Sequence, residues 1–118
     1  MSVVDFSVKT AELDGNAFVV SLTGEVDLHT APELKRALDG VIALGATCAV
    51  VDLADVSFID STTLGVLLRT HTRLEELGGR LVLVASDRRI LRTLELTGLD
   101  RVLPIERTLA EGVAAILE

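Results

Sequence analysis

The sequence is poor in the residues on which several classes of protein depend. One cysteine and two histidines among 118 residues leave no internal disulfide and too few ligands for a zinc site. Basic residues are also scarce, because 11 Lys and Arg stand against 18 Asp and Glu and give a net charge of −7. Nucleic acids and anionic membranes require clustered positive charge, so we expect neither as a partner.

Signals for export and for membrane insertion are absent as well. The N-terminal residues lack a basic region followed by an apolar one, and no apolar run approaches the roughly 18 residues that span a bilayer. The single Cys48 lies in an apolar run, where a cysteine behaves as a small buried hydrophobic residue. We therefore expect a cytoplasmic protein that carries no metal and no cofactor.

Hydrophobic residues make up 49% of the chain, which is enough for the core of one domain spanning residues 1–118. Polar and apolar residues alternate on both sides of Asp14-Gly15, a dipeptide of tight turns, and this predicts an opening β-hairpin. Later apolar runs predict central parallel strands, followed by a short edge strand that contains a proline. The expected strands are Val4–Val8, Phe18–Leu22, Cys48–Leu53, Leu81–Ala85 and Val102–Ile105.

Helix signals fall between and after these strands. Thr30 with Glu33, and Thr108 with Glu111, have the spacing of capping boxes, and Ser86 is the expected cap of the helix between them. The last helix is expected to bury Leu109, Val113, Ile116 and Leu117. This order of elements predicts an α/β fold, a mixed sheet of four to five strands with about four helices packed on it.

The most informative stretch joins the third strand to the second helix. Asp60 is placed to cap the helix with its carboxylate, which makes Ser61 the first helical residue and turns its hydroxyl to solvent. Free amide groups and the positive end of the helix dipole favour a phosphate here, whether bound or covalently attached. Ser61 is therefore the candidate functional residue.

The helix that begins at Ser61 has two different faces. An apolar stripe with spacings of three and four is expected on the core and consists of Leu64, Leu67, Leu68, His71 and Leu74. The other face is polar apart from Val66, which we expect to be exposed. We predict that a partner docks along this face on Thr62, Val66, Arg69 and Arg73.

Two loops at the carboxyl ends of parallel strands, Glu25–Thr30 and Ala54–Asp60, are expected to lie side by side. Asp27 and Asp55 would then lie near Ser61. Each acidic residue also has a purely structural interpretation, in which Asp60 only caps the helix and Asp27 only holds a solvated turn. His71 is expected in the core. The arginines at positions 88, 89, 92, 101 and 107 are interpreted as solvated charges, although an acidic partner segment is an alternative.

Several of these segments together resemble one family. The segments Gly24–Ala31 and Val51–Leu68 look like the two signature regions of STAS domains, and they are most similar to those of the anti-sigma factor antagonists. Gly78-Gly79 and Thr97-Gly98-Leu99 also match that pattern. The resemblance covers essentially the whole chain.

The resemblance implies a bacterial partner switch. In that family the serine after the aspartate is phosphorylated by an anti-sigma factor that is a GHKL-type serine kinase, and a metal-dependent serine phosphatase reverses this. The unphosphorylated antagonist binds the kinase and frees its sigma factor. By position, Ser61 is the phosphate acceptor, with Asp60 and Asp27 beside it.

The sequence departs from the family pattern at Thr63, where a glycine is common. Partner contacts that need close approach to the backbone are therefore in question, and Thr62 or Thr63 is a minor candidate acceptor. The partner-binding set implied by position and pattern is Asp27, Asp60, Thr62, Thr63, Val66, Arg69 and Arg73.

Two other classes of function were weighed against the switch. A hydrolase with Ser61 as nucleophile needs a nearby base, and His71 lies ten residues further along the same helix, about 15 Å away. The sequence has no Gly-x-Ser-x-Gly elbow and no glycine-rich phosphate loop, so we expect no enzyme. The remaining alternative is a STAS subunit of a transport or signalling complex that is never phosphorylated.

Overall fold

The structure is a computed structural model and describes residues 6–117. Five strands form one sheet in the order β1-β2-β3-β4-β5. The first two strands are antiparallel, and every later neighbouring pair is parallel. The strands are β1 (Ser7–Asp14), β2 (Ala17–Val26), β3 (Cys48–Ile59), β4 (Arg80–Val84) and β5 (Ile105–Glu106). The predicted mixed sheet and its opening hairpin are confirmed, except that Val4 lies outside the described residues.

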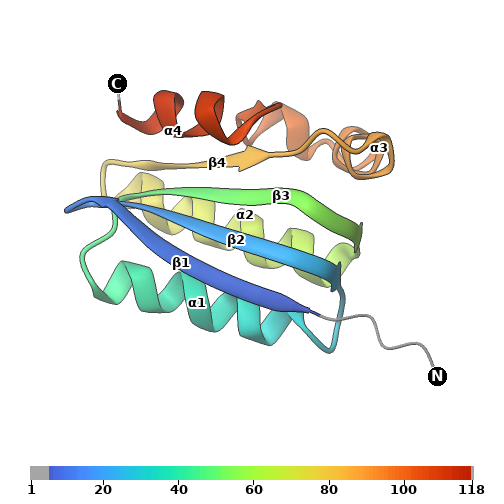
Figure 1. Cartoon of the computed structure of the whole chain (residues 1–118), viewed down its shortest axis with the longest axis horizontal. Helices are drawn as coiled ribbons and strands as arrows, with labels where there is room; N and C mark the ends of the chain where they lie inside the picture. Colours follow the sequence, from blue (N-terminus) through green and yellow to red (C-terminus); the bar gives the residue numbers. More distant parts are fainter. Residues whose placement is uncertain (1–5, 118) are drawn as a thin grey trace.

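Helices pack on both faces of this sheet (Figure 1). They are α1 (Ala31–Ala43), α2 (Ser61–Glu76), α3 (Arg88–Leu96) and α4 (Leu109–Leu117), with a short 3-10 turn η1 (Leu99–Arg101). The first three helices share one hydrophobic core with the sheet, and α4 closes a smaller core on the opposite face. Among residues 6–117 no helix is both long enough and apolar enough to cross a bilayer.

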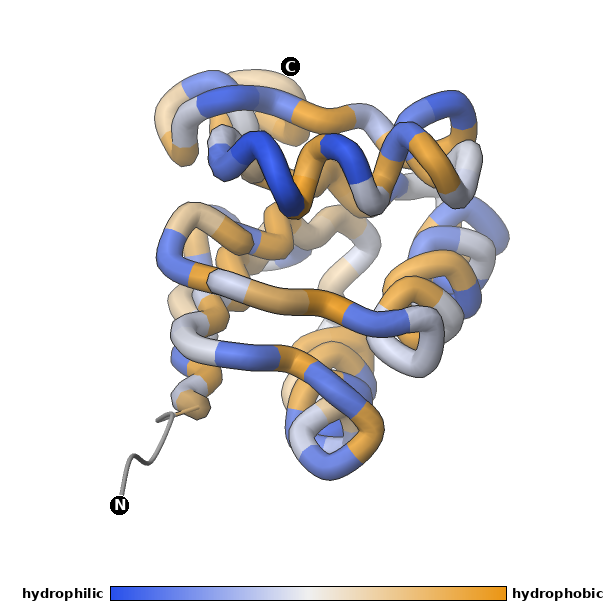
Figure 2. The backbone as a smooth tube through the Cα atoms, turned by 90° about the vertical axis from the view of Figure 1, so that its right-hand side faces the viewer, coloured by the Kyte–Doolittle hydropathy of each residue, from blue (hydrophilic) through white to orange (hydrophobic). Residues whose placement is uncertain are grey.

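Strand β4 and the part of β3 that pairs with it are largely buried, because both of their faces are covered. Along β3, Ala49 and Val51 point into the larger core, while Val50 between them points into the smaller one. Figure 2 shows how hydrophobic and hydrophilic residues are distributed along the backbone. Cys48, at the start of β3, is half-buried rather than fully buried.

The last helix packs through small residues. A Cβ atom on Gly112 would lie 2.6 Å from Cγ2 of Val84, so only glycine allows α4 to approach β4 so closely. Ile116 is buried beside it, as expected. The prediction that Leu109 and Leu117 are buried is wrong, because they are 40% and 53% exposed. Because α4 contacts the sheet most closely at Gly112, its buried face is narrower than the apolar stripe in its sequence predicts.

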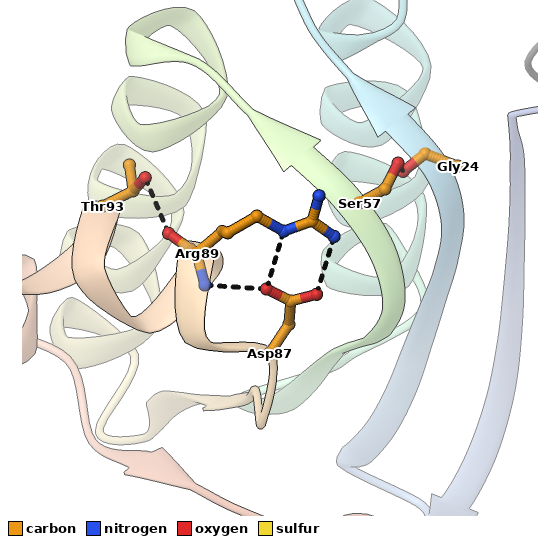
Figure 3. A network of polar contacts seen from close by, with 5 residues as sticks. All are labelled: Gly24, Ser57, Asp87, Arg89 and Thr93. Carbon is orange, nitrogen blue, oxygen red and sulfur yellow. Dashed lines mark hydrogen bonds and ion pairs between the residues drawn. The ribbon is translucent and has the colours of Figure 1, made fainter.

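Of the caps predicted for α1, α3 and α4, two are wrong and one is confirmed. The side chain of Thr30 makes no cap hydrogen bond to α1, and α3 is capped by Asp87 rather than Ser86. Oδ1 of Asp87 accepts from the backbone N–H of Arg89 at 2.7 Å. The guanidinium of Arg89 also binds this carboxylate (Figure 3) and lowers its pKa to about 2. Thr108 accepts from the N–H of Glu111 at 3.1 Å, as its spacing predicts.

The third strand is longer than predicted. It runs to Ile59, because β2 continues to pair with it through two irregularities of register, whereas its pairing with β4 ends at Asp52. Asp55 is paired with Thr23 and lies four residues before the end of β3, roughly 13 Å along the strand. The prediction that Asp55 lies near Ser61 is therefore wrong. The edge strand β5 is also displaced to Ile105–Glu106.

The second helix begins as the sequence predicts. Asp60 has extended backbone angles, and its Oδ1 accepts from the backbone N–H of Thr63 at 3.0 Å. The helix ends at Glu76, and Gly78 then takes a positive φ of 84°. Asp60 is thus a true N-cap, in contact with two groups of Thr63, its amide and its hydroxyl.

Asp60→Ala is expected to lower the free energy of unfolding by about 1 kcal/mol, because it removes an N-cap. Urea and thermal denaturation measure this change. Asp60→Asn is the matched control, since asparagine caps about as well as aspartate and should keep most of the stability. Equal stability of the parent and the alanine variant would contradict the cap.

Candidate functional site

The candidate site forms where two neighbouring parallel strands end together. Val26 of β2 pairs with Ile59 of β3, so the residues that follow them, Asp27 and Asp60, emerge side by side on strands about 4.8 Å apart. The predicted closeness of these two loops is confirmed at their Asp27 and Asp60 positions. The site therefore has two carboxylates at its base and the start of α2 immediately after Asp60.

Thr63 connects the two strand ends. Its side chain is fully buried, and its hydroxyl donates to the backbone carbonyl of Val26 at 2.9 Å. The same oxygen lies 3.1 Å from Oδ1 of Asp60. Thr63 is a minor candidate acceptor by its sequence position, and its burial argues against that role, because its hydroxyl is turned inward and engaged. At this position, threonine attaches the first turn of α2 to β2.

Ser61 and Thr62 are both exposed at the start of α2. Within residues 6–117 the hydroxyl of Ser61 makes no hydrogen bond, and neither backbone N–H of these two residues is paired. Unpaired amides and the positive end of the helix dipole both stabilise negative charge at this place. The geometry therefore suits an anionic group on Ser61.

Asp27 is part of a tight turn. Its Oδ1 accepts from the N–H groups of His29 at 2.8 Å and Thr30 at 3.2 Å. These hydrogen bonds, led by that from His29, lower the pKa of Asp27 below its ordinary value of 3.8. The hydroxyl of Thr30 accepts from the N–H of Asp27 and donates to the carbonyl of Glu25, which is why it does not cap α1. Asp27 thus holds its loop in place as an ionised group.

A groove runs between α1 and α2 from the Ser61 end. It consists of two adjoining hollows of about 210 and 140 Å³, which share Lys35, Val66 and Arg69. We call them together the α1–α2 groove. The four residues predicted to form a docking surface all line it, and sequence reasoning missed the contribution of α1. The lining from the preceding loop and α1 is Leu28, Ala31, Pro32, Lys35 and Asp39.

The exposure predicted for two residues of α2 is wrong. Val66 is only 6% exposed, whereas Leu68, expected in the core, is 39% exposed. Because α1 packs beside α2, the buried surface of α2 includes the side that faces α1 as well as the side that faces the sheet. Val66 therefore lies in the wall of the groove. The exposed hydrophobic residue at its open end is Leu28, which is 64% exposed.

The rim of the groove carries cations. Asp39 binds Lys35 at 2.7 Å and Arg73 at 2.8 Å, and these partners, Lys35 first, lower the pKa of Asp39. Arg69 has no carboxylate within ion-pair distance in the described part of the chain. A Cβ atom on Gly65 would lie 3.2 Å from Nη1 of Arg69, so this guanidinium folds back over Gly65 along the helix. Its free charge is thus directed toward the Ser61 end.

His71 takes the place expected for it in the core. It is 5% exposed, its Nε2 lies 3.3 Å from Oε1 of Glu75, and its Nδ1 has no hydrogen-bond partner among the described residues, 6–117. Ten residues of helix separate it from Ser61, a rise of about 15 Å. The site next to Ser61 is therefore made of carboxylates, free amides and a cationic groove, which suit binding of a partner and of a phosphate.

Comparisons with known proteins agree with this fold. A STAS domain family model matches residues 8–112. An anti-sigma-B factor antagonist of Listeria monocytogenes is 32% identical over 108 residues, which are 92% of this chain and 95% of that protein. The crystal structure of an anti-sigma factor antagonist from Mycobacterium paratuberculosis is 32% identical, with a TM-score of 0.88 over 97% of this chain and 96% of that one.

The same fold occurs in SpoIIAA, an anti-sigma factor antagonist that is 21% identical. Its unphosphorylated form has a TM-score of 0.81 over 93% of this chain and 96% of that one. The phosphorylated form of the Bacillus protein has a TM-score of 0.73 over 93% of this chain and 99% of that one. By its family match, its curated relatives and its fold, the chain belongs to the STAS domain family.

Proposed function

We propose that this protein is an anti-sigma factor antagonist that is switched by phosphorylation of Ser61. The unphosphorylated form binds an anti-sigma factor and releases its sigma factor, and phosphorylation ends that binding. The observation that carries this proposal is the exposed hydroxyl of Ser61, directly after Asp60, which makes no hydrogen bond within residues 6–117 and lies at the two unpaired amides that begin α2. Relatives that are 32% identical and named as such antagonists support it.

The partners in this proposal follow from the family resemblance. The anti-sigma factor is a serine kinase of the GHKL type, and a metal-dependent serine phosphatase removes the phosphate in the cytoplasm. The protein itself acts by binding and not as an enzyme. Ser61 is the acceptor; Thr62 is exposed beside it and is the minor candidate, while Thr63 is buried.

A phosphate on Ser61 would leave the fold intact and change the surface. The helix N-terminus accommodates the added charge of about −2. The phosphate would stand beside Asp60 and Asp27, whose carboxylates already make this end acidic. A partner carboxylate about 6 Å from the phosphate would be repelled by roughly 2 to 3 kcal/mol per unit charge at an effective dielectric of about 20. Such repulsion is large enough to release the partner.

We propose the α1–α2 groove as the docking surface of the anti-sigma factor. It begins beside Thr62 and offers Leu28 and Val66 to an apolar side chain of the partner. Arg69, the cation of its rim that has no carboxylate partner among residues 6–117, suits an acidic residue next to that side chain. Because a kinase must reach Ser61 to phosphorylate it, a surface that starts at Ser61 serves both binding and modification.

The first test is the position of the phosphate. Incubation with the cognate kinase and ATP is expected to add one phosphate, located at Ser61 by mass spectrometry of a digest. Ser61→Ala should abolish the labelling, and Thr62→Ala should keep it. Labelling that survives Ser61→Ala unchanged would show that the acceptor is another residue. If the parent protein is not labelled at all, the result would favour the alternative function, an interaction subunit that is never phosphorylated.

The second test concerns the electrostatic switch. Ser61→Ala is expected to bind the kinase about as tightly as the parent, whereas Ser61→Asp should bind at least about tenfold more weakly, a change of 1.4 kcal/mol. Titration calorimetry measures both affinities, and circular dichroism verifies that the fold is unchanged. Ser61→Asn is the uncharged control for size. Equal affinities for the aspartate and alanine variants would refute the electrostatic explanation.

The third test concerns the groove. Leu28→Ala should weaken binding to the anti-sigma factor by about 1 kcal/mol, or roughly fivefold, because an exposed apolar anchor is shortened. Leu96→Ala is the matched control, since Leu96 is 72% exposed on α3, outside the groove. The same loss of affinity in both variants would argue against docking at the groove. At a saturating concentration of kinase, the purified Leu28→Ala variant should still be phosphorylated at Ser61.

A further inference from the structure

A second hollow lies on α3, away from the groove. Its volume is about 470 Å³, within the range of ligand sites. It lies between α3 and Arg107, which is in the segment that joins β5 to α4. Its lining consists of Ser86, Arg88, Leu91, Arg92, Glu95 and Arg107. Three of the five arginines that the sequence suggests are merely solvated thus line one hollow.

The three arginines of this hollow are not neutralised by ion pairs. Within residues 6–117, Arg88, Arg92 and Arg107 have no carboxylate within 4.0 Å. Arg89, the neighbour of Arg88, is different, because it is paired with Asp87 at 3.0 Å (Figure 3). The lining thus holds three arginines without an ion pair in the described part of the chain and one carboxylate, that of Glu95. The hollow is therefore net positive in a chain with a net charge of −7.

We propose that this hollow binds an acidic peptide segment of a protein partner, at a recognition site distinct from the Ser61 end. Arg88 and Arg92 are one helical turn apart on α3, about 6 Å between their Cβ atoms, and Arg107 lies across the hollow. Separate guanidinium groups match carboxylates spaced along a chain, each by two parallel hydrogen bonds. Half-buried Leu91 provides an apolar contact between them.

A small phosphate ligand fits the surroundings less well. Phosphate sites use free backbone amides at helix N-termini, but the Arg89 amide at the start of α3 already donates to Asp87 at 2.7 Å. The carboxylate of Asp87 also holds a negative charge at that helix end. At the start of α4, the Glu111 amide is likewise engaged, by the hydroxyl of Thr108 at 3.1 Å. The hollow therefore offers the guanidinium groups of arginine side chains rather than a cluster of free backbone amides.

The acidic-segment site is independent of the proposed switch. It shares no lining residue with the α1–α2 groove. Strand β3 continues past Asp52, its last residue paired with β4, before the chain reaches Ser61, whereas α3 begins soon after β4 ends. The two sites therefore follow the ends of different strands. A charge change at Ser61 is therefore expected to leave binding at the hollow unchanged.

The experiment uses a fluorescent hexaglutamate peptide as the probe for the full chain, with affinity measured by anisotropy at fixed ionic strength. Saturable binding is expected, and two-dimensional NMR should place it on the Nε–H signals of Arg88, Arg92 and Arg107. Arg92→Gln and Arg107→Gln should each weaken binding about threefold, and the double variant about tenfold. Arg101→Gln is the matched control, because it changes the net charge equally on an arginine outside the hollow.

The outcomes separate the proposal from its competitors. Unchanged binding by Arg101→Gln and Ser61→Asp supports a local site for an acidic segment. An equal loss in Arg101→Gln would reveal nonspecific attraction, and the absence of saturable binding would refute the site. Pyrophosphate is the second probe. If it binds the same arginines more tightly than hexaglutamate, the ligand is a small phosphate compound and the peptide assignment is wrong.

Discussion

The hydrogen bond from Thr63 to the carbonyl of Val26 is the contact on which the candidate site depends. It joins the first turn of α2 to the end of β2, while Asp60 caps the same turn from the end of β3. The end of β2 thereby meets the junction of β3 and α2, which is distant from it in sequence. The amide and the hydroxyl of Thr63 are both hydrogen-bonded inside the protein. The hydroxyl that remains exposed to solvent at the start of α2 is therefore above all that of Ser61.

Packing of α1 beside α2 has a comparable effect on the surface. It buries Val66 against the neighbouring helix and leaves a shallow groove whose wall is apolar and whose rim is cationic. Asp39 engages Lys35 and Arg73 within this rim, whereas Arg69 remains without such a partner among residues 6–117. The groove thus offers a partner an apolar wall, whose burial favours affinity, and the charge of Arg69, which favours one orientation of the partner. Both lie next to Ser61, the residue proposed to be phosphorylated.

Charge is distributed unevenly over the molecule. The Ser61 end carries Asp27 and Asp60, and the hydrogen bonds that Asp27 accepts stabilise its ionised form. The α3 corner carries the three free arginines of the second hollow. A net charge of −7 conceals this contrast, since it reports a sum and not a pattern. One small fold therefore presents two surfaces of different chemistry, each built on residues that follow the carboxyl end of a strand.

The sequence by itself determined the features that depend on near neighbours in the chain. Helical periodicity, the Asp60 cap and the hairpin turn involve residues a few positions apart, so α2 and its exposed Ser61 were predictable. Only the tertiary structure decided that Val66 is buried, that Leu68 is exposed and that the Thr63 hydroxyl binds Val26. Burial depends on which element packs against a face. The grouping of Arg88, Arg92 and Arg107 depends likewise on where two distant segments meet, which local spacing does not encode.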